Sequence, residues 1–169
     1  MAHSFDDPAG LRSDVHLAVQ AKRAGRVKGE SLASDHQDDI VVHAWDWGLS
    51  AGHALGSTQK TARRSYQELS VVKSIDAATT PLMSALATND ELKEVVLSMR
   101  RCGGGQFDYL RIKLSGARIV SLRQQTDAGG ITSETVTFAF TQVEVQYTPQ
   151  KADGSAGAAT TFTDQVIPS

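Results

Sequence analysis

The stretch Thr135-Val136-Thr137-Phe138-Ala139-Phe140-Thr141 shows most clearly what kind of fold this chain adopts. Apolar side chains stand at Val136, Phe138 and Phe140, and small or polar side chains stand between them. Successive side chains of a β-strand point to opposite faces, so this alternation is typical of a strand with one buried face. The stretch therefore predicts a half-buried strand.

The same alternation recurs on both sides of this stretch, at Val15, Leu17 and Val19, at Leu69 and Val71, and at Val95, Leu97 and Met99. Turn-forming residues separate the patterns, at Gly103–Gly105, Ser115–Gly116 and Gly129–Gly130. Consecutive strands joined by short turns pair antiparallel. The sequence predicts a mainly β protein, either an antiparallel β-barrel or a two-sheet sandwich.

One segment predicts a short helix. Thr80–Pro81 provides an N-cap residue and a first-turn proline, and Leu82, Met83 and Leu86 then share one helix face. Asn89–Asp90 is expected to end the helix. Because two helical turns are not stable alone, we expect this helix to lie against the side of the barrel and to cover an end or an edge.

The composition indicates one compact domain. The chain has 169 residues, of which 17 are basic and 19 acidic, for a net charge of −2. We expect a flexible N-terminal segment at 1–12 and a single domain at 13–169. The charge balance argues against nucleic-acid binding. Met1–Leu11 lacks a secretory signal pattern, and no apolar run reaches the roughly 18 residues of a membrane span.

No cofactor or metal site is expected. Cys102 is the only cysteine, so the chain cannot form an internal disulfide. The histidines are spaced irregularly, at His3, His16, His36, His43 and His53, without a pattern typical of metal ligands. We therefore expect these side chains to be exposed or to form hydrogen bonds.

Gly48–Thr61 is rich in small residues and has no strand pattern, so it predicts a long loop of the kind that is often functional. It contains Gly48-Leu49-Ser50-Ala51-Gly52, which matches the G-x-S-x-G motif of serine hydrolases. That motif must open a helix and be followed by an acid and then a histidine. Here the last histidine is His53, so a glycine-rich loop is the better interpretation.

Ile40–Gly48 contains two tryptophans and predicts a strand with apolar residues on both faces. One face would carry Val41, His43, Trp45 and Trp47, and the other would carry Ile40, Val42, Ala44 and Asp46. A small protein with a strand covered on both sides is expected to associate with other chains.

Several motifs together resemble one family. They are Gly29-Glu30-Ser31 with His36, Asp39-Ile40, Ala44-Trp45-Asp46-Trp47-Gly48, Asp76 with Thr80-Pro81-Leu82, Arg101-Cys102-Gly103-Gly104, and Tyr147-Thr148-Pro149-Gln150-Lys151-Ala152-Asp153-Gly154. This combination, spread over about 13–165, resembles the hemolysin-coregulated proteins (Hcp), which form the tube of the bacterial type VI secretion system.

The resemblance implies a barrel with a helix at its side, assembly into a hexameric ring, and stacking of rings into a hollow tube without catalysis. The implied partners are a valine-glycine-repeat spike, a contractile sheath and effectors carried in the lumen. The protein would reside in the bacterial cytoplasm before firing and would then be secreted without a signal peptide.

The resemblance also assigns site residues. Asp46 and Ala44 are expected to face the lumen and effectors, and Asp46 replaces the small polar residue that is common between the two tryptophans, so that six copies would make an anionic ring. The loop residues Gly48, Ser50, Gly52, His53, Gly56 and Lys60 are expected to contact neighbouring subunits or rings.

The alternative from another class is a small ligand-binding β-barrel in which Trp45 and Trp47 line an internal pocket. Such a protein would bind its ligand without forming oligomers.

Overall fold

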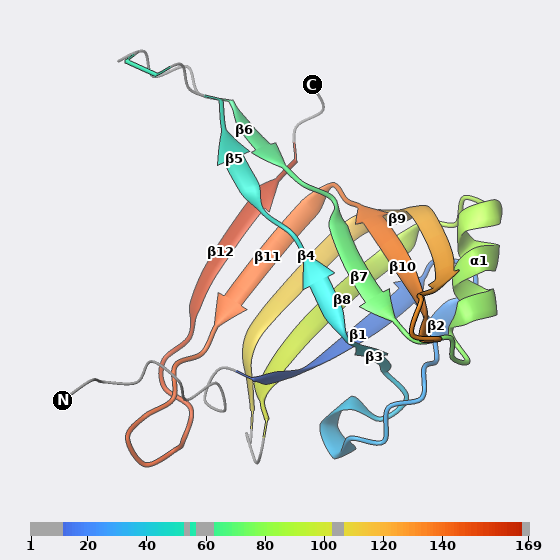
Figure 1. Cartoon of the computed structure of the whole chain (residues 1–169). Helices are drawn as coiled ribbons and strands as arrows, with labels where there is room; N and C mark the ends of the chain where they lie inside the picture. Colours follow the sequence, from blue (N-terminus) through green and yellow to red (C-terminus); the bar gives the residue numbers. More distant parts are fainter. Residues whose placement is uncertain (1–11, 53–54, 57–62, 103–106, 167–169) are drawn as a thin grey trace.

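A computed structural model describes residues 12–52, 55–56, 63–102 and 107–166 of the chain. The fold is mainly β with one α-helix, as the alternating patterns predict (Figure 1). The expected flexible segment 1–12 and the expected Gly103–Gly105 turn lie outside the described residues, apart from Arg12. The elements are β1 (Ser13–Ala21), β2 (Gly25–Val27), the 3-10 turn η2 (Ser34–His36), β3 (Ile40–Val42), β4 (Ala44–Asp46), β5 (Leu49–Ala51), β6 (Arg64–Tyr66), β7 (Leu69–Lys73), α1 (Thr79–Ala87), β8 (Leu92–Arg101), β9 (Asp108–Thr126), β10 (Thr132–Ala139), β11 (Gln142–Tyr147) and β12 (Thr160–Gln165).

The strands pair antiparallel into two sheets that share β9. Sheet A has the order β2-β1-β8-β9-β11-β12, and β3 also pairs with β1. Sheet B has the order β9-β10-β7-β4. Figure 1 shows β4, β7 and β10 in front of the longer strands of sheet A. The apolar faces of the two sheets therefore enclose one core, in the barrel-like arrangement that the sequence predicts.

β9 joins the two sheets because it bends near Gly116. Its first half, up to Ala117, pairs with β8, and its second half, from Arg118 on, pairs with β10. Gly116 has a φ of 55°, in the left-handed region that favours glycine. A Cβ atom there would lie 2.2 Å from Oγ1 of Thr141. The predicted turn at Ser115–Gly116 was therefore wrong: the glycine bends a 19-residue strand and does not end it.

The predicted two-faced strand at Ile40–Gly48 is broken at His43. β3 pairs with β1 in sheet A, whereas β4 pairs with β7 in sheet B. Ile40 and Val42 are buried, but beyond the break the side chains that pack on the core are those of Trp45 and Trp47. Val41 and Ala44 are exposed in this single chain, so the chain itself does not cover both faces, and coverage by another chain stays a prediction. The segment instead crosses from one sheet to the other.

The core is formed by the residues that the alternation identifies. Leu17, Val19, Leu69, Val71, Val95, Leu97, Val136 and Phe138 are each at most 1% exposed. They lie in one continuous cluster that also includes residues of β9 and α1. Removal of these apolar side chains from water opposes the conformational entropy that the chain loses on folding.

α1 packs against β9 at the side of the barrel (Figure 1). It buries Thr79, Leu82 and Ala85, whereas Met83 is 37% exposed and is not on the buried face. The helix begins at Thr79 and has Ala78 as its N-cap, so the prediction of Thr80 as the cap was wrong. A carboxylate oxygen of Asp76 accepts a hydrogen bond from the Ala78 amide at 2.9 Å and provides the capping that Thr80 was expected to supply.

A buried ion pair connects α1 to sheet B. Lys73 and Glu134 are opposite each other on β7 and β10, and both are fully buried. Nζ of Lys73 lies 2.8 Å from the carboxylate of Glu134 and 2.7 Å from that of Asp76. The Thr79 hydroxyl donates to the same Glu134 carboxylate at 2.5 Å. Paired charges avoid most of the penalty that an isolated buried charge would have.

We expect Gly116→Ala to destabilise the protein by about 2 kcal/mol or more. An alanine at this φ costs about 1–2 kcal/mol, and the contact with Thr141 adds to that cost. The measurement is the urea-induced unfolding midpoint and its slope.

Gly130→Ala is the matched control, because Gly130 also has a positive φ, 81°, but has open space where the Cβ would lie. Adding Thr141→Ala to Gly116→Ala should recover part of the loss. Equal losses for the two glycine variants would contradict the close-contact argument.

Candidate functional site

The predicted long loop contains a β-hairpin that projects from the barrel. β5 and β6 form their own two-stranded sheet and extend away from the ten-stranded sheet (Figure 1). The sequence predicted a loop without strands at Gly48–Thr61, and this prediction was wrong at β5. The pairing continues at both ends, because the Gln67 amide donates to the Gly48 carbonyl at 2.9 Å and the Gly52 amide donates to the Arg63 carbonyl at 3.0 Å.

Four of the six expected contact residues lie in the described part of this segment. Gly48 lies at its base, Ser50 in the middle of β5, and Gly52 just beyond β5. Gly56 lies farther along with a φ of 84°. His53 and Lys60 lie outside the described residues. Leu49 and Leu55 are 52% and fully exposed, so the hairpin presents apolar side chains to solvent within the described chain.

Ser50 is not placed as a serine nucleophile. A nucleophile elbow sits at a sharp turn between a strand and a helix. Ser50 instead pairs with Ser65 inside an antiparallel hairpin, and β6 is the next described element along the chain. The geometry thus agrees with the interpretation of this motif as part of a glycine-rich segment.

Three aromatic rings pack at the base of the hairpin. The ring centroids of Trp47 and Tyr66 are 6.1 Å apart, and the Phe140 ring lies 6.0 Å from that of Tyr66 in an edge-to-face arrangement. Offset and edge-to-face packing of this kind stabilises aromatic clusters. Trp47 therefore contacts side chains of its own chain, which gives no support to the alternative of a ligand pocket lined by the tryptophans.

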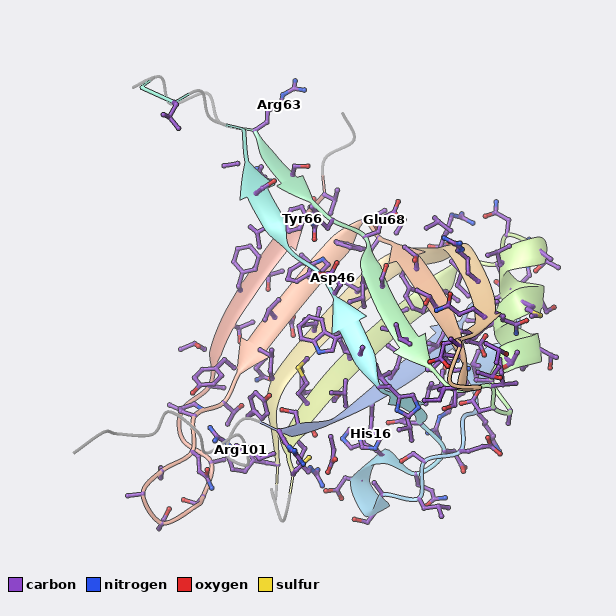
Figure 2. The ribbon with its side chains drawn as sticks, in the orientation of Figure 1. His16, Asp46, Arg63, Tyr66, Glu68 and Arg101 are labelled. Atoms are coloured by element: carbon purple, nitrogen blue, oxygen red, sulfur yellow. The ribbon has the colours of Figure 1, made fainter. Side chains whose placement is uncertain are left out.

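Asp46 (labelled in Figure 2) and Ala44 lie on the outer face of sheet B, because Trp45 and Trp47 occupy the core-facing positions. Both are exposed. The backbone pairing places Asp46 beside Ser70 of β7. Asp46 and Ala44 thus share one face, as predicted, and no described element covers that face.

The pairing register extends this outer face across all four strands of sheet B. One row consists of Asp46, Ser70, Thr137 and Ser121, and the next consists of Ala44, Val72, Thr135 and Arg123. The hydroxyls of Ser70 and Thr137 are 3.0 Å apart. Four of these eight side chains therefore carry a hydroxyl, two are apolar, one is a carboxylate and one is a guanidinium. Sequence reasoning did not find the residues next to Asp46, because only the strand pairing makes them neighbours.

The histidines His16 and His36 meet on the outer side of sheet A. Their rings stack with centroids 4.5 Å apart and an interplanar angle of 4°. His36 also uses both ring nitrogens, at 2.9 Å from a carboxylate oxygen of Asp39 and at 2.9 Å from one of Asp108. The expectation that these histidines form hydrogen bonds is correct for His36. Burial lowers the pKa of His16, and the nearby His36 ring lowers it further. The carboxylates around it raise this pKa by less, so the net shift is downward.

The Gly29-Glu30-Ser31 motif with His36 and Asp39 forms a folded loop that rests on this sheet. The Ser31 amide donates to the Asp39 carbonyl at 3.0 Å, and the Gly29 amide donates to the Asp38 carbonyl at 2.7 Å. A Cβ at Gly29 would lie 2.5 Å from the Asp39 carbonyl oxygen, so only glycine fits there. The motif residues thus hold the loop over β1 and β9.

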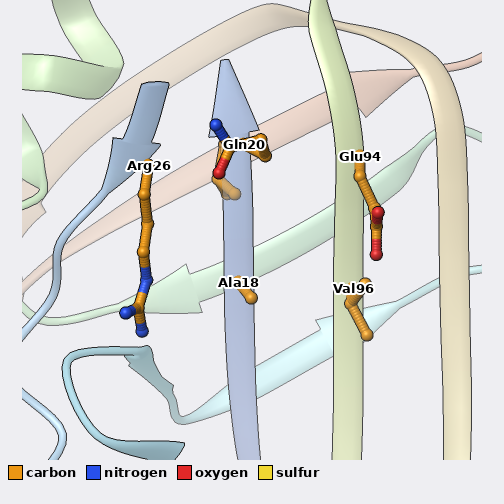
Figure 3. A pocket seen from close by; sticks show the side chains of 6 residues that line it. Ala18, Gln20, Arg26, Glu94 and Val96 are labelled. Carbon is orange, nitrogen blue, oxygen red and sulfur yellow. The ribbon is translucent and has the colours of Figure 1, made fainter. Parts of the chain in front are cut away.

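A small open hollow of about 190 Å³ lies on the outer side of β1 (Figure 3). Arg26 of β2 flanks it on one side and Glu94 of β8 on the other, with Ala18 and Gln20 between them. Arg26 is engaged elsewhere, because it donates to the Gln37 carbonyl and to Asp39. The hollow contains no tryptophan, so it also differs from the expected ligand pocket.

Two other kinds of feature are absent from the ranges that the structure describes. No group of three or more His, Cys, Asp or Glu side chains in these ranges is arranged to hold a metal ion. Among the helices of the described chain, none is long and apolar enough to cross a membrane.

Comparison with known proteins gives one consistent result. The family model described as "Type VI secretion system effector, Hcp" matches residues 19–147. The chain belongs to the Hcp family. It is 36% identical over 137 residues to Protein hcp1 of Pseudomonas aeruginosa, covering 79% of this chain and 85% of that protein.

Solved Hcp structures share its fold. A type six secretion system protein of known structure superposes with a TM-score of 0.79 at 25% identity, covering 88% of this chain and 92% of the other. Hcp1 from Salmonella typhimurium superposes with a TM-score of 0.69 at 22% identity, covering 91% and 95%. The mainly β fold with one helix is therefore that of Hcp proteins, as the sequence motifs predict.

We expect the stability of this Hcp protein to fall as the pH decreases below about 6.5. The pKa of His16 is lower in the folded state than its ordinary value of 6.5, so the unfolded chain binds the proton more readily. The stabilising contribution is present above pH 6.5 and is lost as the pH falls toward the folded-state pKa. Chemical unfolding between pH 7.5 and 5.0 measures it.

His16→Phe should give a flatter pH profile, because phenylalanine preserves an aromatic ring against His36 without titrating. An equally steep profile in this variant would show that another group is responsible.

Proposed function

We propose that the chain is a non-catalytic, ring-forming subunit of the type VI secretion tube. Six copies form a hexameric ring, and the rings stack into a hollow tube that carries effectors and meets a valine-glycine-repeat spike and a contractile sheath. The protein is held in the bacterial cytoplasm and is then expelled with the tube. Membership of the Hcp family supports this proposal.

The observation that carries the proposal is the projecting hairpin. β5 and β6 project from the barrel beyond Tyr66, which packs against the core, and Leu49 and Leu55 remain exposed on the described part. A solvent-facing hairpin with apolar side chains costs free energy in an isolated monomer. The hairpin residues Gly48, Ser50, Gly52 and Gly56 would contact a subunit of the next ring. This contact would bury the exposed leucine side chains.

The outer face of sheet B is the proposed lumen wall. Half of the eight side chains in its two rows carry a hydroxyl that can bind water, and its apolar members, Ala44 and Val72, are small. Unfolded or partly folded cargo would therefore not adhere strongly. Asp46 adds six carboxylates to each ring. Arg123 in the adjacent row adds six cations, so the wall would bear charges of both signs and need not repel acidic cargo overall.

We expect the purified protein to have a mass of about 109 kDa, six times the 18.1 kDa of one chain. Native mass spectrometry and light scattering measure this mass. Monomers alone across a range of concentrations would contradict the proposal, as would quenching of tryptophan fluorescence by a small ligand without any oligomer.

We expect Asp46→Ala to leave the ring intact and to change which cargo it retains. Removal of six lumen carboxylates should weaken retention of a basic peptide roughly fivefold at low salt, since an exposed charge pair contributes at most about 1 kcal/mol. Co-sedimentation of labelled basic and acidic peptides measures retention, and native mass spectrometry confirms the ring.

Glu144→Ala is the control for this experiment, because Glu144 lies on β11 in sheet A, outside the proposed lumen wall. It should not alter retention. If Asp46→Ala abolishes the ring, Asp46 lies in a subunit contact and its assignment to the lumen is wrong.

A further inference from the structure

A carboxylate from β12 holds the side of the projecting hairpin. Nε of Arg64 lies 2.5 Å from Oδ2 of Asp164, and Nη2 of Arg64 donates to Oδ1 at 3.0 Å. The hydroxyl of Tyr66 donates to Oδ2 at 2.5 Å. About 100 residues of sequence separate the partners. These three residues, Arg64, Tyr66 and Asp164, are called the hairpin clamp below.

Asp164 occupies an unusual position for an acidic residue. It pairs with Val143 of β11, a fully buried core residue, so it lies on the core-facing side of sheet A. Its side chain is only 19% exposed, compared with 48% for Arg64. A carboxylate at such a position is stable only with hydrogen-bond donors close by. Tyr66 and Arg64 supply them, and they lower the pKa of Asp164.

At its base the hairpin continues the β4–β7 pair of sheet B, because the Gln67–Gly48 hydrogen bond follows the pairing of Asp46 with Ser70. An isolated two-stranded hairpin is only marginally stable, and β5 and β6 pair only with each other in the described chain. The aromatic contacts of Trp47 and Phe140 hold Tyr66 at the base. All these contacts lie at the base, so the part of the hairpin beyond the base can still bend.

The hairpin clamp provides two attachment points on β6. Arg64 and Tyr66 are two residues apart on β6, so they share one face and lie about 6.6 Å apart along the strand. Asp164 binds both, and Arg64 also donates to the Gln165 carbonyl at 3.4 Å. Two attachment points along one strand fix the angle at which that strand leaves the barrel. The bidentate geometry with arginine adds directional preference.

We propose that Asp164 is a positioning residue that sets the direction of the β5–β6 hairpin, and that it thereby determines whether the hairpin of one ring can engage the next ring. This inference rests on the proposed function, in which the hairpin bridges stacked rings. Asp164 itself need not touch the neighbouring ring, because it acts through Arg64 and Tyr66.

The test compares ring formation with ring stacking in the full-length protein. For Asp164→Asn and Asp164→Ala, native mass spectrometry should show an unchanged hexamer. Sedimentation velocity and electron microscopy at the same concentration should show at least fivefold fewer stacked rings. Asp153→Asn is the matched control, since Asp153 is exposed and accepts hydrogen bonds from the amide and the hydroxyl of Ser155 in its own loop. It should stack normally.

Exchange of the two charged residues, Arg64 and Asp164, tests whether ring stacking can be restored. Arg64→Asp alone and Asp164→Arg alone should each reduce stacking, and the double variant should restore at least half of it. If Asp164 contributed only to the overall stability of the protein, the double variant would not recover ring stacking. Normal stacking in both Asp164→Asn and Asp164→Ala would overturn the proposal, and so would loss of the hexamer in both variants.

Amide hydrogen exchange tests the role of Asp164 in the hairpin even if the rings do not stack. In the Asp164 variants, the Gly52 amide, which donates to Arg63 across the hairpin, should exchange at least fivefold faster. Amides of β7 within its ladder to β10 should exchange unchanged and serve as the internal reference. Failure of the wild type to stack would contradict the proposed function. Unchanged exchange at Gly52 would contradict the role of Asp164.

Discussion

The bend of β9 at Gly116 is the constraint on which the rest of the fold depends. Because β8 and β11 pair with the first half of this strand and β10 pairs with the second half, the angle at Gly116 sets the angle between the two sheets. The left-handed φ and the close approach of Thr141 restrict this position to glycine. The direction of sheet B then determines where Asp46 points.

Much of the fold follows from local sequence pattern, since β1, β7, β8 and β10 each have one face in the core and therefore alternate. The pattern fails where the backbone geometry is unusual. Gly116 has the local signature of a turn but bends a continuous strand. At His43 the chain leaves one sheet for the other, so the core-facing set of side chains changes partway through an apparently regular stretch.

The candidate site was predictable to the extent that it depends on neighbours in the sequence. Asp46 alternates with Trp45 and Trp47, so its place opposite the core follows from the period of a strand. The pairing of Asp164 with Arg64, and that of His36 with Asp108, joins residues that are far apart in the chain. No local pattern identifies such pairs. Only the family resemblance grouped His36 with Asp39, and their contacts explain both residues as supports of a folded loop.

The ion pair between Lys73 and Glu134 has a consequence for how the molecule unfolds. Thr79, the first residue of α1, donates a hydrogen bond to the Glu134 carboxylate, and Asp76 beside the helix contacts Lys73. Detachment of the helix would remove partners from two fully buried charges and open a path for water into sheet B. The helix and the barrel are therefore one cooperative unit, and partial unfolding that begins at α1 is disfavoured even though the helix lies at the edge of the molecule.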